Sequence, residues 1–217
     1  IASIVKKEQY YCVMRISQHS LSALDLFAAK IGGAKKTIFR SSNSNVYGGT
    51  TSNILHKLFI WLPKTVSSIK IAPSTEAAEF MFGKKSVRKG KVHLVHNAIN
   101  VSQFNFSQRK RDLIREEFNI KDKFVVGHVG RFNRQKNHSY LIDIFNKVSK
   151  MCNNSILLLV GKGELENDIK EKIKLLGLSD KVIFTGVRPD VPDLLMAMDV
   201  FVFPSFFEGM PNTVIEA

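Results

Sequence analysis

The chain has 217 residues, of which 44% are hydrophobic and 24% charged, and its formal net charge is +13. A globular protein of this length buries a substantial core and forms one large domain or two small ones. Its two cysteines, Cys12 and Cys152, lie far apart without metal-ligand spacing, which argues against a disulfide framework and a zinc site. No stretch approaches the roughly 18 uninterrupted apolar residues of a membrane-spanning helix. The positive charge favours partners that carry phosphate, such as nucleotide sugars, nucleic acid or anionic lipid.

In the first half of the chain, the pattern of apolar residues is irregular. It predicts strands at residues 10–16, 36–40 and 91–95, and helices at 21–31, 55–62 and 74–82. Gly32 and Gly33 follow the first of these helices and are its stop signal. A turn-like segment at 96–100 follows the last strand, and we place a domain boundary near residue 98.

In the second half, short apolar runs alternate with amphipathic segments. Strands are predicted at residues 124–130, 155–161, 181–186 and 199–204, and helices after Asn137, at 164–176, at 191–198 and from about residue 210. Asn137 is expected to cap its helix, and Gly177 to end the next one. This alternation predicts a parallel α/β sheet, in which ligands bind at the carboxyl ends of the strands. The loops at those ends are therefore expected to line one crevice.

Two cations of the loop after the first of these strands are candidates for binding phosphate. Arg131 offers a planar fork for phosphate oxygens and Lys136 a compact charge, while Gly130 lets a ligand approach the backbone closely. The alternative is a polar loop with two solvated cations. A dinucleotide-binding interpretation fails, because residues 127–130 lack the third glycine of the GxGxxG motif and no helix begins at once.

The last segment of the chain has two glutamates on either side of a predicted helix start. Glu208 and Glu216 flank a Gly-Met-Pro-Asn-Thr sequence, and Pro211 is tolerated early in a helix. Exposed N–H groups at a helix start favour a diphosphate, and carboxylates accept hydrogen bonds from sugar hydroxyls. The alternative is two surface glutamates that act as helix-start charges.

Taken together, these segments resemble the donor domain of glycosyltransferase family 4, which has the GT-B fold of two facing Rossmann-like domains. The matching segments are Gly130-Arg131 with Lys136-Asn137, residues 159–164, 182–186 and 203–205, and Glu208-Gly209-Met210-Pro211 with Glu216-Ala217. Their order and spacing fit throughout residues 124–217, and residues 94–104 resemble the interdomain segment. The resemblance implies an α/β protein with two parallel-sheet domains, both incomplete: an acceptor-side domain at 1–98 and a donor domain at 99–217.

The resemblance also implies roles for individual residues. Arg131 and Lys136 would neutralise the diphosphate and stabilise the leaving group, Glu208 would contact the donor sugar, and Glu216 would hold the ribose. Sugar and phosphate oxygens would contact Gly130, the backbone around Gly209, Met210 and Asn212, and the hydroxyl of Thr213. Val187 and Arg188 would lie near the base. Such enzymes are retaining, need no metal and use no cofactor, since the nucleotide sugar is a substrate.

The first half matches the family less specifically. Family members often carry a His-x-His sequence after a strand near this point, and here residues 15–19 read Arg-Ile-Ser-Gln-His. His19 is the candidate for a histidine that faces the donor, although the register is shifted. The alternative is a surface or core histidine.

The expected function is transfer of a sugar, favoured as a UDP-sugar, to a bacterial polysaccharide or lipid-linked acceptor at the inner face of the cytoplasmic membrane. The basic residues Lys84, Lys85, Arg88, Lys89 and Lys91 suit an anionic membrane surface or are simply solvated. The alternatives are a GT-B-type sugar-nucleotide epimerase and an inactive fragment that only binds nucleotide. For residues 1–217 alone, we expect weak turnover or none. We expect no nucleic-acid partner, because no basic recognition helix is evident.

Overall fold

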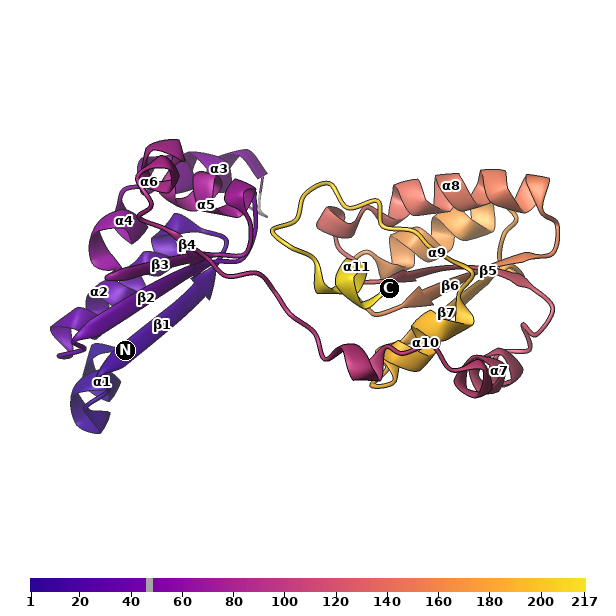
Figure 1. The fold of residues 1–217 in the computed structure, drawn as a ribbon. Coiled ribbons are helices and arrows are strands. Elements are labelled where there is room, and N and C mark those ends of the chain that lie inside the picture. The colour runs from indigo at the N-terminus through magenta and orange to yellow at the C-terminus, as the bar shows by residue number, and fades with distance from the viewer. Residues whose placement is uncertain (46–48) are drawn as a thin grey trace. The chain divides into compact units, whose positions relative to one another are not determined.

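The computed structural model describes residues 1–45 and 49–217 and divides into two compact units. Unit 1 comprises Ile1–Asn97 together with Phe207–Pro211, and unit 2 comprises Ala98–Phe206 together with Asn212–Ala217 (Figure 1). The chain therefore leaves unit 2 for a short segment that belongs to unit 1 and then returns. Over residues 1–45 and 49–217, no helix is both long enough and apolar enough to cross a bilayer.

Unit 1 is a four-stranded parallel sheet with helices packed on it. Its strands, in the order β1-β2-β3-β4, are β1 (Cys12–Ser17), β2 (Lys36–Ser41), β3 (Ile69–Ala72) and β4 (His93–Leu94). Its helices are α1 (Ala2–Glu8), α2 (Leu24–Ile31), α3 (Gly49–Leu58), α4 (Leu62–Val66), α5 (Thr75–Phe82) and α6 (Lys84–Arg88), and a 3₁₀ turn covers Ser20–Ala23. Phe39 of β2 lies at the centre of the core, where it packs with Leu26 of α2 and Phe82 of α5.

Unit 2 is a second four-stranded parallel sheet, in the order β7-β6-β5-β8. The strands are β5 (Phe124–Val129), β6 (Ser155–Val160), β7 (Val182–Gly186) and β8 (Val200–Phe201). The helices are α7 (Gln108–Glu117), α8 (His138–Met151), α9 (Glu166–Leu175), α10 (Val191–Ala197) and α11 (Asn212–Glu216), and 3₁₀ turns cover Val101–Gln103 and Arg134–Lys136.

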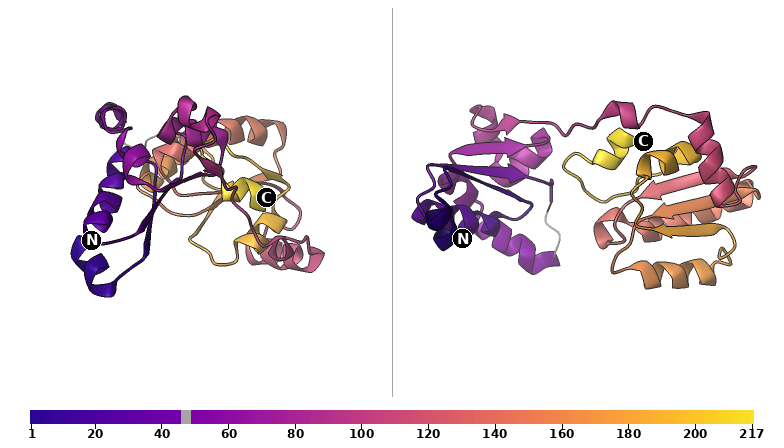
Figure 2. Two further views of the ribbon diagram at one scale, coloured as in Figure 1. Left: turned by 60° about the vertical axis from the view of Figure 1, so that its left-hand side comes forward. Right: turned by 90° about the horizontal axis from the view of Figure 1, so that it is seen from below.

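Helices cover both faces of the unit 2 sheet. Figures 1 and 2 show α8 and α9 on one face and α7 and α10 on the other. Side chains alternate accordingly: Val126 packs against α8 and α9, whereas Val125 packs against α7 and α10. Because both faces are covered, β6 is buried along its whole length, which explains why the central strands read as continuous apolar runs.

The α/β fold with two parallel sheets, predicted from the sequence, is confirmed, as is the alternation of strands and helices in unit 2. Several boundaries in unit 2 differ from the prediction. The strand expected at 199–204 has only two paired residues in β8, α9 begins at Glu166, and the last helix begins at Asn212. Asn137 precedes α8 as predicted but does not cap it through its side chain, because its backbone is left-handed (φ 54°) and its amide donates to the Pro204 carbonyl, 3.3 Å away.

In unit 1, the prediction of one helix at 55–62 is wrong. The structure has α3 up to Leu58 and a separate α4 from Leu62, with Pro63 in the first turn of α4, where a missing N–H costs nothing. Four further elements were not predicted: α1, β3, α6 and, in unit 2, α7. All are short or highly charged, so their apolar periodicity is too weak to indicate them.

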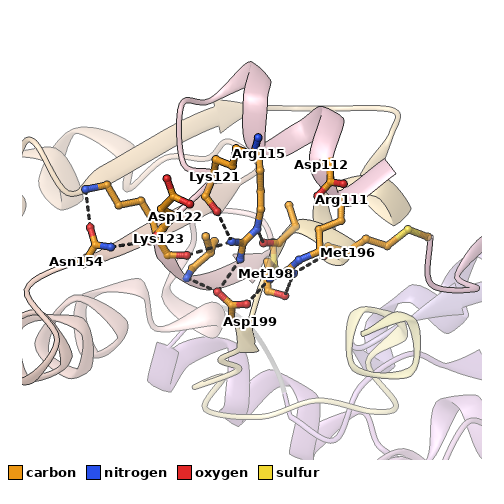
Figure 3. Close-up of polar contacts among 12 residues, drawn as sticks. Arg111, Asp112, Arg115, Lys121, Asp122, Lys123, Asn154, Met196, Met198 and Asp199 are labelled. Atoms are coloured by element: carbon orange, nitrogen blue, oxygen red, sulfur yellow. Dashed lines mark hydrogen bonds and ion pairs between the residues drawn. The ribbon is translucent and has the colours of Figure 1, made fainter. Parts of the chain in front are cut away.

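An ion-pair network around Asp199 fastens α7 and α10 to the sheet of unit 2 (Figure 3). Asp199, just before β8, accepts hydrogen bonds from Arg115 Nη2 at 2.6 Å and from the Val125 N–H at 2.7 Å, and it also pairs with Arg111. Arg115 further donates to the carbonyls of Ala197, Lys121 and Lys123. Burial by itself raises the pKa of Asp199, but the hydrogen bonds from Val125, Arg111 and Arg115 outweigh it, so the pKa lies below its ordinary value.

Replacing Asp199 with Asn is expected to destabilise unit 2 by about 2 kcal/mol at neutral pH, because two arginines then lose a charged partner. The lowered pKa means that the carboxylate stabilises the fold above about pH 4, the ordinary value for Asp, and loses this effect as the pH falls through the lower folded value. Urea unfolding should therefore show the two proteins converging in acid. Asp122→Asn, an exposed neighbour, is the control, and an equal loss there would contradict the assignment.

Candidate functional site

The strand order of unit 2 creates a switch point between β5 and β8. The chain passes from β5 to β6 on one side, whereas β8 pairs with β5 on the other side. The Val202 N–H donates to the Gly127 carbonyl at 2.9 Å, and the Phe206 N–H donates to the Gln135 carbonyl at 2.9 Å. The segments after β5 and after β8 are thus hydrogen-bonded to each other at the carboxyl edge. Ligands of open α/β sheets bind at this kind of position.

Glycines allow the backbone segments at this edge to pack directly on each other. The Gly130 N–H donates to Val160 and the Gly161 N–H to Gly186, each at 2.9 Å, so the ends of β5, β6 and β7 are joined. Gly161 has a φ of 131°, and a Cβ there would lie 2.2 Å from the Gly130 oxygen. A Cβ at Gly163 would lie 2.3 Å from the oxygen of the buried Phe132. The position of the loop at 130–137 therefore depends on residues that lack side chains.

The two cations predicted to bind phosphate both lie on this loop. Arg131 is 74% exposed, and its Nε lies 3.8 Å from Glu164 Oε2 at the end of the neighbouring β6 loop. The Lys136 ammonium lies 4.4 Å above the centre of the Phe203 ring, in the segment after β8. A guanidinium and an ammonium on one short loop at the switch point make an anion site chemically suited to a diphosphate.

Two histidines lie beneath this loop. His128, in β5, and His138, at the start of α8, are almost fully buried, with ring centroids 4.8 Å apart. His128 Nδ1 donates to the Val202 carbonyl at 2.8 Å, and its Nε2 has no partner among the described residues. A Cβ at Gly130 would lie 2.8 Å from that Nε2, so the ring directly underlies the loop. Neither nitrogen of His138 has a partner among the described residues.

Both histidines are neutral. Burial is the main cause that lowers the pKa of His128 from 6.5 to about 4. The hydrogen bond to the Val202 carbonyl partly opposes this shift, and the charge of Lys136 adds to it. Burial and the neighbouring His128 and Lys136 lower the pKa of His138 from 6.5 to about 3. The positive charge of the loop thus comes from Arg131, Arg134 and Lys136 and not from the rings beneath it. Sequence reasoning missed both histidines, although His128 is the one polar residue inside an apolar run.

The predicted residues of the last helix also belong to unit 2. α11 is only five residues long and carries Asn212, Thr213 and Glu216. The hydroxyl oxygens of Thr213 and of Ser205 are buried and have no hydrogen-bond partner among the described residues. Two such hydroxyls near the ends of β8 and α11 can donate to ligand oxygens.

Val187 and Arg188, predicted to lie near the base, follow β7. Val187 is exposed, but the Arg188 guanidinium is occupied: it contacts Asp190 Oδ1 and Oδ2 at 2.8 and 2.6 Å and Glu117 Oε1 at 2.6 Å. Hydrogen bonds to Asp190 and Glu117 raise the pKa of Arg188. A base at this position would therefore meet the Val187 side chain or the backbone, and not the Arg188 donors.

In unit 1, His19 lies just after the carboxyl end of β1, as predicted, but both ring nitrogens are occupied. Nδ1 accepts from the Leu21 N–H at 3.1 Å, so Nε2 carries the proton and donates to the Ser52 carbonyl at 3.0 Å. In this arrangement His19 caps the 3₁₀ turn that follows β1. A role towards a donor would require one of these bonds to open.

The segment with Glu208, Gly209 and Met210 also belongs to unit 1. Asn97, after β4, donates through Nδ2 to the Met210 carbonyl at 2.6 Å, and the Ser44 hydroxyl donates to the Glu208 carbonyl. A Cβ at Gly209 would lie 2.6 Å from the Ser42 oxygen. The segment is thus seated at the carboxyl ends of β2 and β4 by close backbone contacts.

The structure thus assigns the predicted residues to two groups. Unit 2 holds Gly130, Arg131, Lys136, Val187, Arg188, Asn212, Thr213 and Glu216, and unit 1 holds His19, Glu208, Gly209 and Met210. Within each unit, these residues follow the carboxyl ends of parallel strands or lie in the segment after β8. A single donor site built from both groups stays a prediction. Asn97, which orients Met210, was not predicted.

Two solved structures share this architecture. The structure of Anabaena Alr3699/HepE in complex with UDP and glucose matches this chain with a TM-score of 0.81 at 20% identity. The match covers 100% of this chain and 59% of HepE. WaaG, a glycosyltransferase involved in lipopolysaccharide biosynthesis, has a TM-score of 0.74 at 14% identity over 99% of this chain and 59% of the other. The two parallel-sheet units therefore define a protein of the GT-B fold.

The family model for glycosyl transferases group 1 matches residues 110–217, and the chain belongs to this family. It is 28% identical over 221 residues to the Escherichia coli UDP-Gal:alpha-D-GlcNAc-diphosphoundecaprenol alpha-1,3-galactosyltransferase, covering 99% of this chain and 57% of that protein. It is 27% identical over 166 residues to the Campylobacter jejuni N-acetylgalactosamine-N,N'-diacetylbacillosaminyl-diphospho-undecaprenol 4-alpha-N-acetylgalactosaminyltransferase, covering 76% of this chain and 43% of that protein. The chain thus spans about half the length of these relatives.

Gly161→Ala is expected to destabilise the protein by about 3 kcal/mol, because the added Cβ meets the Gly130 oxygen and the positive φ strains it. Gly177→Ala is the matched control: its φ is also positive, at 66°, but a Cβ there meets nothing. We expect a cost of about 1 kcal/mol there from the backbone conformation alone. Urea unfolding of both variants measures the difference, and equal costs would rule out the close contact.

The buried histidines predict a loss of stability in mild acid. In the unfolded chain, both histidines become protonated below about pH 6.5, whereas in the folded protein His128 and His138 stay neutral down to about pH 4 and 3. Because the unfolded state then binds more protons, the folded state loses stability as the pH falls. We expect each histidine to lower the free energy of unfolding by roughly 2 kcal/mol between about pH 7 and 5, so that the two together lower it by roughly 4 kcal/mol. His138→Phe, which keeps an aromatic ring there, should flatten this slope, whereas His93→Phe at an exposed position should not. An unchanged slope in His138→Phe would show that the ring titrates normally.

Proposed function

We propose that this protein takes part in transferring a sugar from a nucleoside diphosphate sugar, a UDP-sugar, to a saccharide or lipid-linked acceptor with retention of anomeric configuration. The observation that carries the proposal is the loop with Arg131 and Lys136 at the switch point of a group 1 glycosyl transferase domain. The UDP bound to Anabaena HepE supports the choice of donor, and the diphospho-undecaprenol names of two relatives support a lipid-linked acceptor.

In this proposal, the donor is held by charge at one end and by hydrogen bonds at the other. Arg131 and Lys136 neutralise the diphosphate, and the unpartnered Thr213 hydroxyl donates to a phosphate oxygen. Glu216 accepts from the ribose hydroxyls, and Glu208 from the donor sugar. The neutral His128 and His138 beneath the loop add no charge that would compete with these contacts.

The transfer step moves one sugar between two oxygens. The bond from the anomeric carbon to the diphosphate oxygen breaks, and a bond from that carbon to the acceptor oxygen forms on the same face. The acceptor proton passes to the departing phosphate oxygen. The lysine and arginine stabilise the negative charge that develops on the leaving group, which is why no bound metal is required in this proposal.

The proposed place of reaction is the inner face of the cytoplasmic membrane, reached by peripheral contact. The basic residues Lys84, Lys85, Arg88, Lys89 and Lys91 are all exposed on or after α6 and suit anionic lipid.

Calorimetric titration of the chain with UDP-glucose is expected to show binding that Lys136→Ala weakens by about 10- to 100-fold, because a charged contact to phosphate is lost. Arg131→Ala should have a similar effect, and Glu216→Gln a smaller one. Lys147→Ala, an exposed lysine on α8, is the matched control. If Lys136→Ala and Arg131→Ala both bind as the unchanged chain does, the diphosphate site lies elsewhere.

The same titration with GDP-mannose and ADP-glucose tests the base, and preferential binding of either would overturn the choice of UDP. Where transfer is measurable, the anomeric configuration of the product tests retention, and activity in the presence of a chelator tests metal independence. Interconversion of the donor sugar without release of UDP would instead identify an epimerase.

A further inference from the structure

The segment Phe207–Pro211 belongs to unit 1 and contains no helix or strand, so contacts from other parts of the unit determine its position. The loop after β2 holds the first part of the segment. The Ser44 hydroxyl donates to the Glu208 carbonyl, and Gly209 packs so closely on the same loop that no side chain would fit there. The loop after β4 holds the last part through Asn97.

Asn97 contacts Met210 at two points. Its side-chain Nδ2 donates to the Met210 carbonyl at 2.6 Å, and its backbone N–H lies 3.3 Å from the Met210 Sδ, a weak acceptor. The same residue therefore fixes both the main chain and the side chain of Met210, two positions after Glu208.

The orientation of the Asn97 amide is set by Arg40, near the end of β2. Arg40 Nη2 donates to Asn97 Oδ1. A guanidinium can only donate and a carbonyl can only accept, so one orientation of the amide satisfies both neighbours, with Oδ1 towards Arg40 and Nδ2 towards Met210. The hydrogen bond from the charged guanidinium is stronger than one between neutral groups, which strengthens this preference.

Arg40 is itself fixed by the sheet of unit 1. It pairs with Ile16 of β1 on one side and with Ile71 of β3 on the other, and the residue is half-buried. A regular and rigid element therefore positions the irregular segment at 207–211 through two side chains, those of Arg40 and Asn97.

We propose that Asn97, with its amide oriented by Arg40, is a positioning residue for recognition of the donor sugar. It fixes the main chain at 208–210 so that the Glu208 carboxylate accepts hydrogen bonds from the sugar hydroxyls with good geometry. Such bonds weaken steeply when distance and angle depart from their optimum. The inference rests on the proposed function, in which Glu208 contacts the sugar, and adds two residues that act through Glu208.

The simpler alternative is that Arg40 and Asn97 only stabilise unit 1. Neither belongs to the apolar core around Phe39. The two roles also differ in their effect on ligands. Loss of a purely stabilising contact would weaken binding of UDP and of UDP-glucose equally, whereas loss of a positioning contact would affect only the ligand that carries the sugar.

Calorimetric titration of the chain with UDP-glucose and with UDP separates these two roles. We expect Asn97→Ala to raise the ratio of the two dissociation constants, UDP-glucose over UDP, about tenfold, while UDP binding stays within about twofold. Asn97→Asp should raise the ratio as well, because a carboxylate keeps the contact to Arg40 but has no N–H for the Met210 carbonyl.

Two variants test the role of Arg40. Arg40→Met removes the donor and lets the amide turn, so the ratio should rise. Arg40→Lys keeps a charged donor for Oδ1 and should leave the ratio near that of the unchanged chain. Asn100→Ala is the matched control, because the Asn100 side chain accepts only from Ser102 among the described residues, and it should leave the ratio unchanged.

If Asn97 acts through Glu208, the two substitutions are not independent. Asn97→Ala should raise the ratio little further in a chain that already carries Glu208→Gln, whereas independent effects would multiply. Hydrogen exchange provides a second measurement that needs no ligand. The backbone amides at 207–210 should exchange faster in Asn97→Ala and Arg40→Met than in Asn100→Ala.

An unchanged ratio in Asn97→Ala, equal weakening of UDP and UDP-glucose, unchanged exchange at 207–210, or effects that multiply with Glu208→Gln would each overturn the inference. The proposed function would survive these outcomes, because Arg131→Ala and Lys136→Ala test the diphosphate site separately. An unchanged ratio in Glu208→Gln would show that Glu208 does not contact the sugar and would also overturn the inference. If Arg131→Ala and Lys136→Ala both bind UDP as the unchanged chain does, the proposed function itself fails.

Discussion

Direct packing of backbone on backbone at the carboxyl ends of β5, β6 and β7 is the constraint on which the site in unit 2 depends. The loop at 130–137 can lie across the end of β6 only because Gly161 carries no side chain towards the Gly130 oxygen. Hydrogen bonds from Gly130 and Gly161 then join three strands at the edge where an anion would bind. This contact positions the loop that carries Arg131 and Lys136, so the same small residues that complete the sheet also set the electrostatics of the site.

In unit 2, the charged side chains of the loop lie at the surface, and the polar side chains buried beneath it are neutral. Arg131 and Lys136 are on the loop, within reach of solvent and ligand, while the imidazoles of His128 and His138 beneath them are neutral because burial and the nearby lysine oppose their protonation. At the other end of β5, the carboxylate of Asp199 is charged because two arginines and a backbone N–H surround it. At one end of the sheet, a carboxylate and two arginines thus stabilise α7 and α10, and at the other end the loop carries the cations predicted to bind phosphate.

In unit 1, the residues at the carboxyl edge of the sheet differ in kind from those on the outer helices. The ends of β2 and β4 seat Glu208, Gly209 and Met210 through Ser44 and Asn97, and His19 caps the turn after β1. The apolar and basic side chains of α3, α4 and α6 lie outside that edge, since the core contacts of α3 use its other side.

The sequence by itself determined the class of fold, the strands of unit 2 and the loop with Arg131 and Lys136, because apolar periodicity and glycine stops are local signals. Short or charged elements such as β3 and α7 left no such signal, and the split of residues 55–62 into two helices depends on how Pro63 packs. Only the tertiary structure decided that Asn97 holds Met210, that Arg188 is occupied by Glu117 and that His128 is neutral. These properties come from contacts between residues distant in the chain or from burial, and the spacing of neighbouring residues indicates neither.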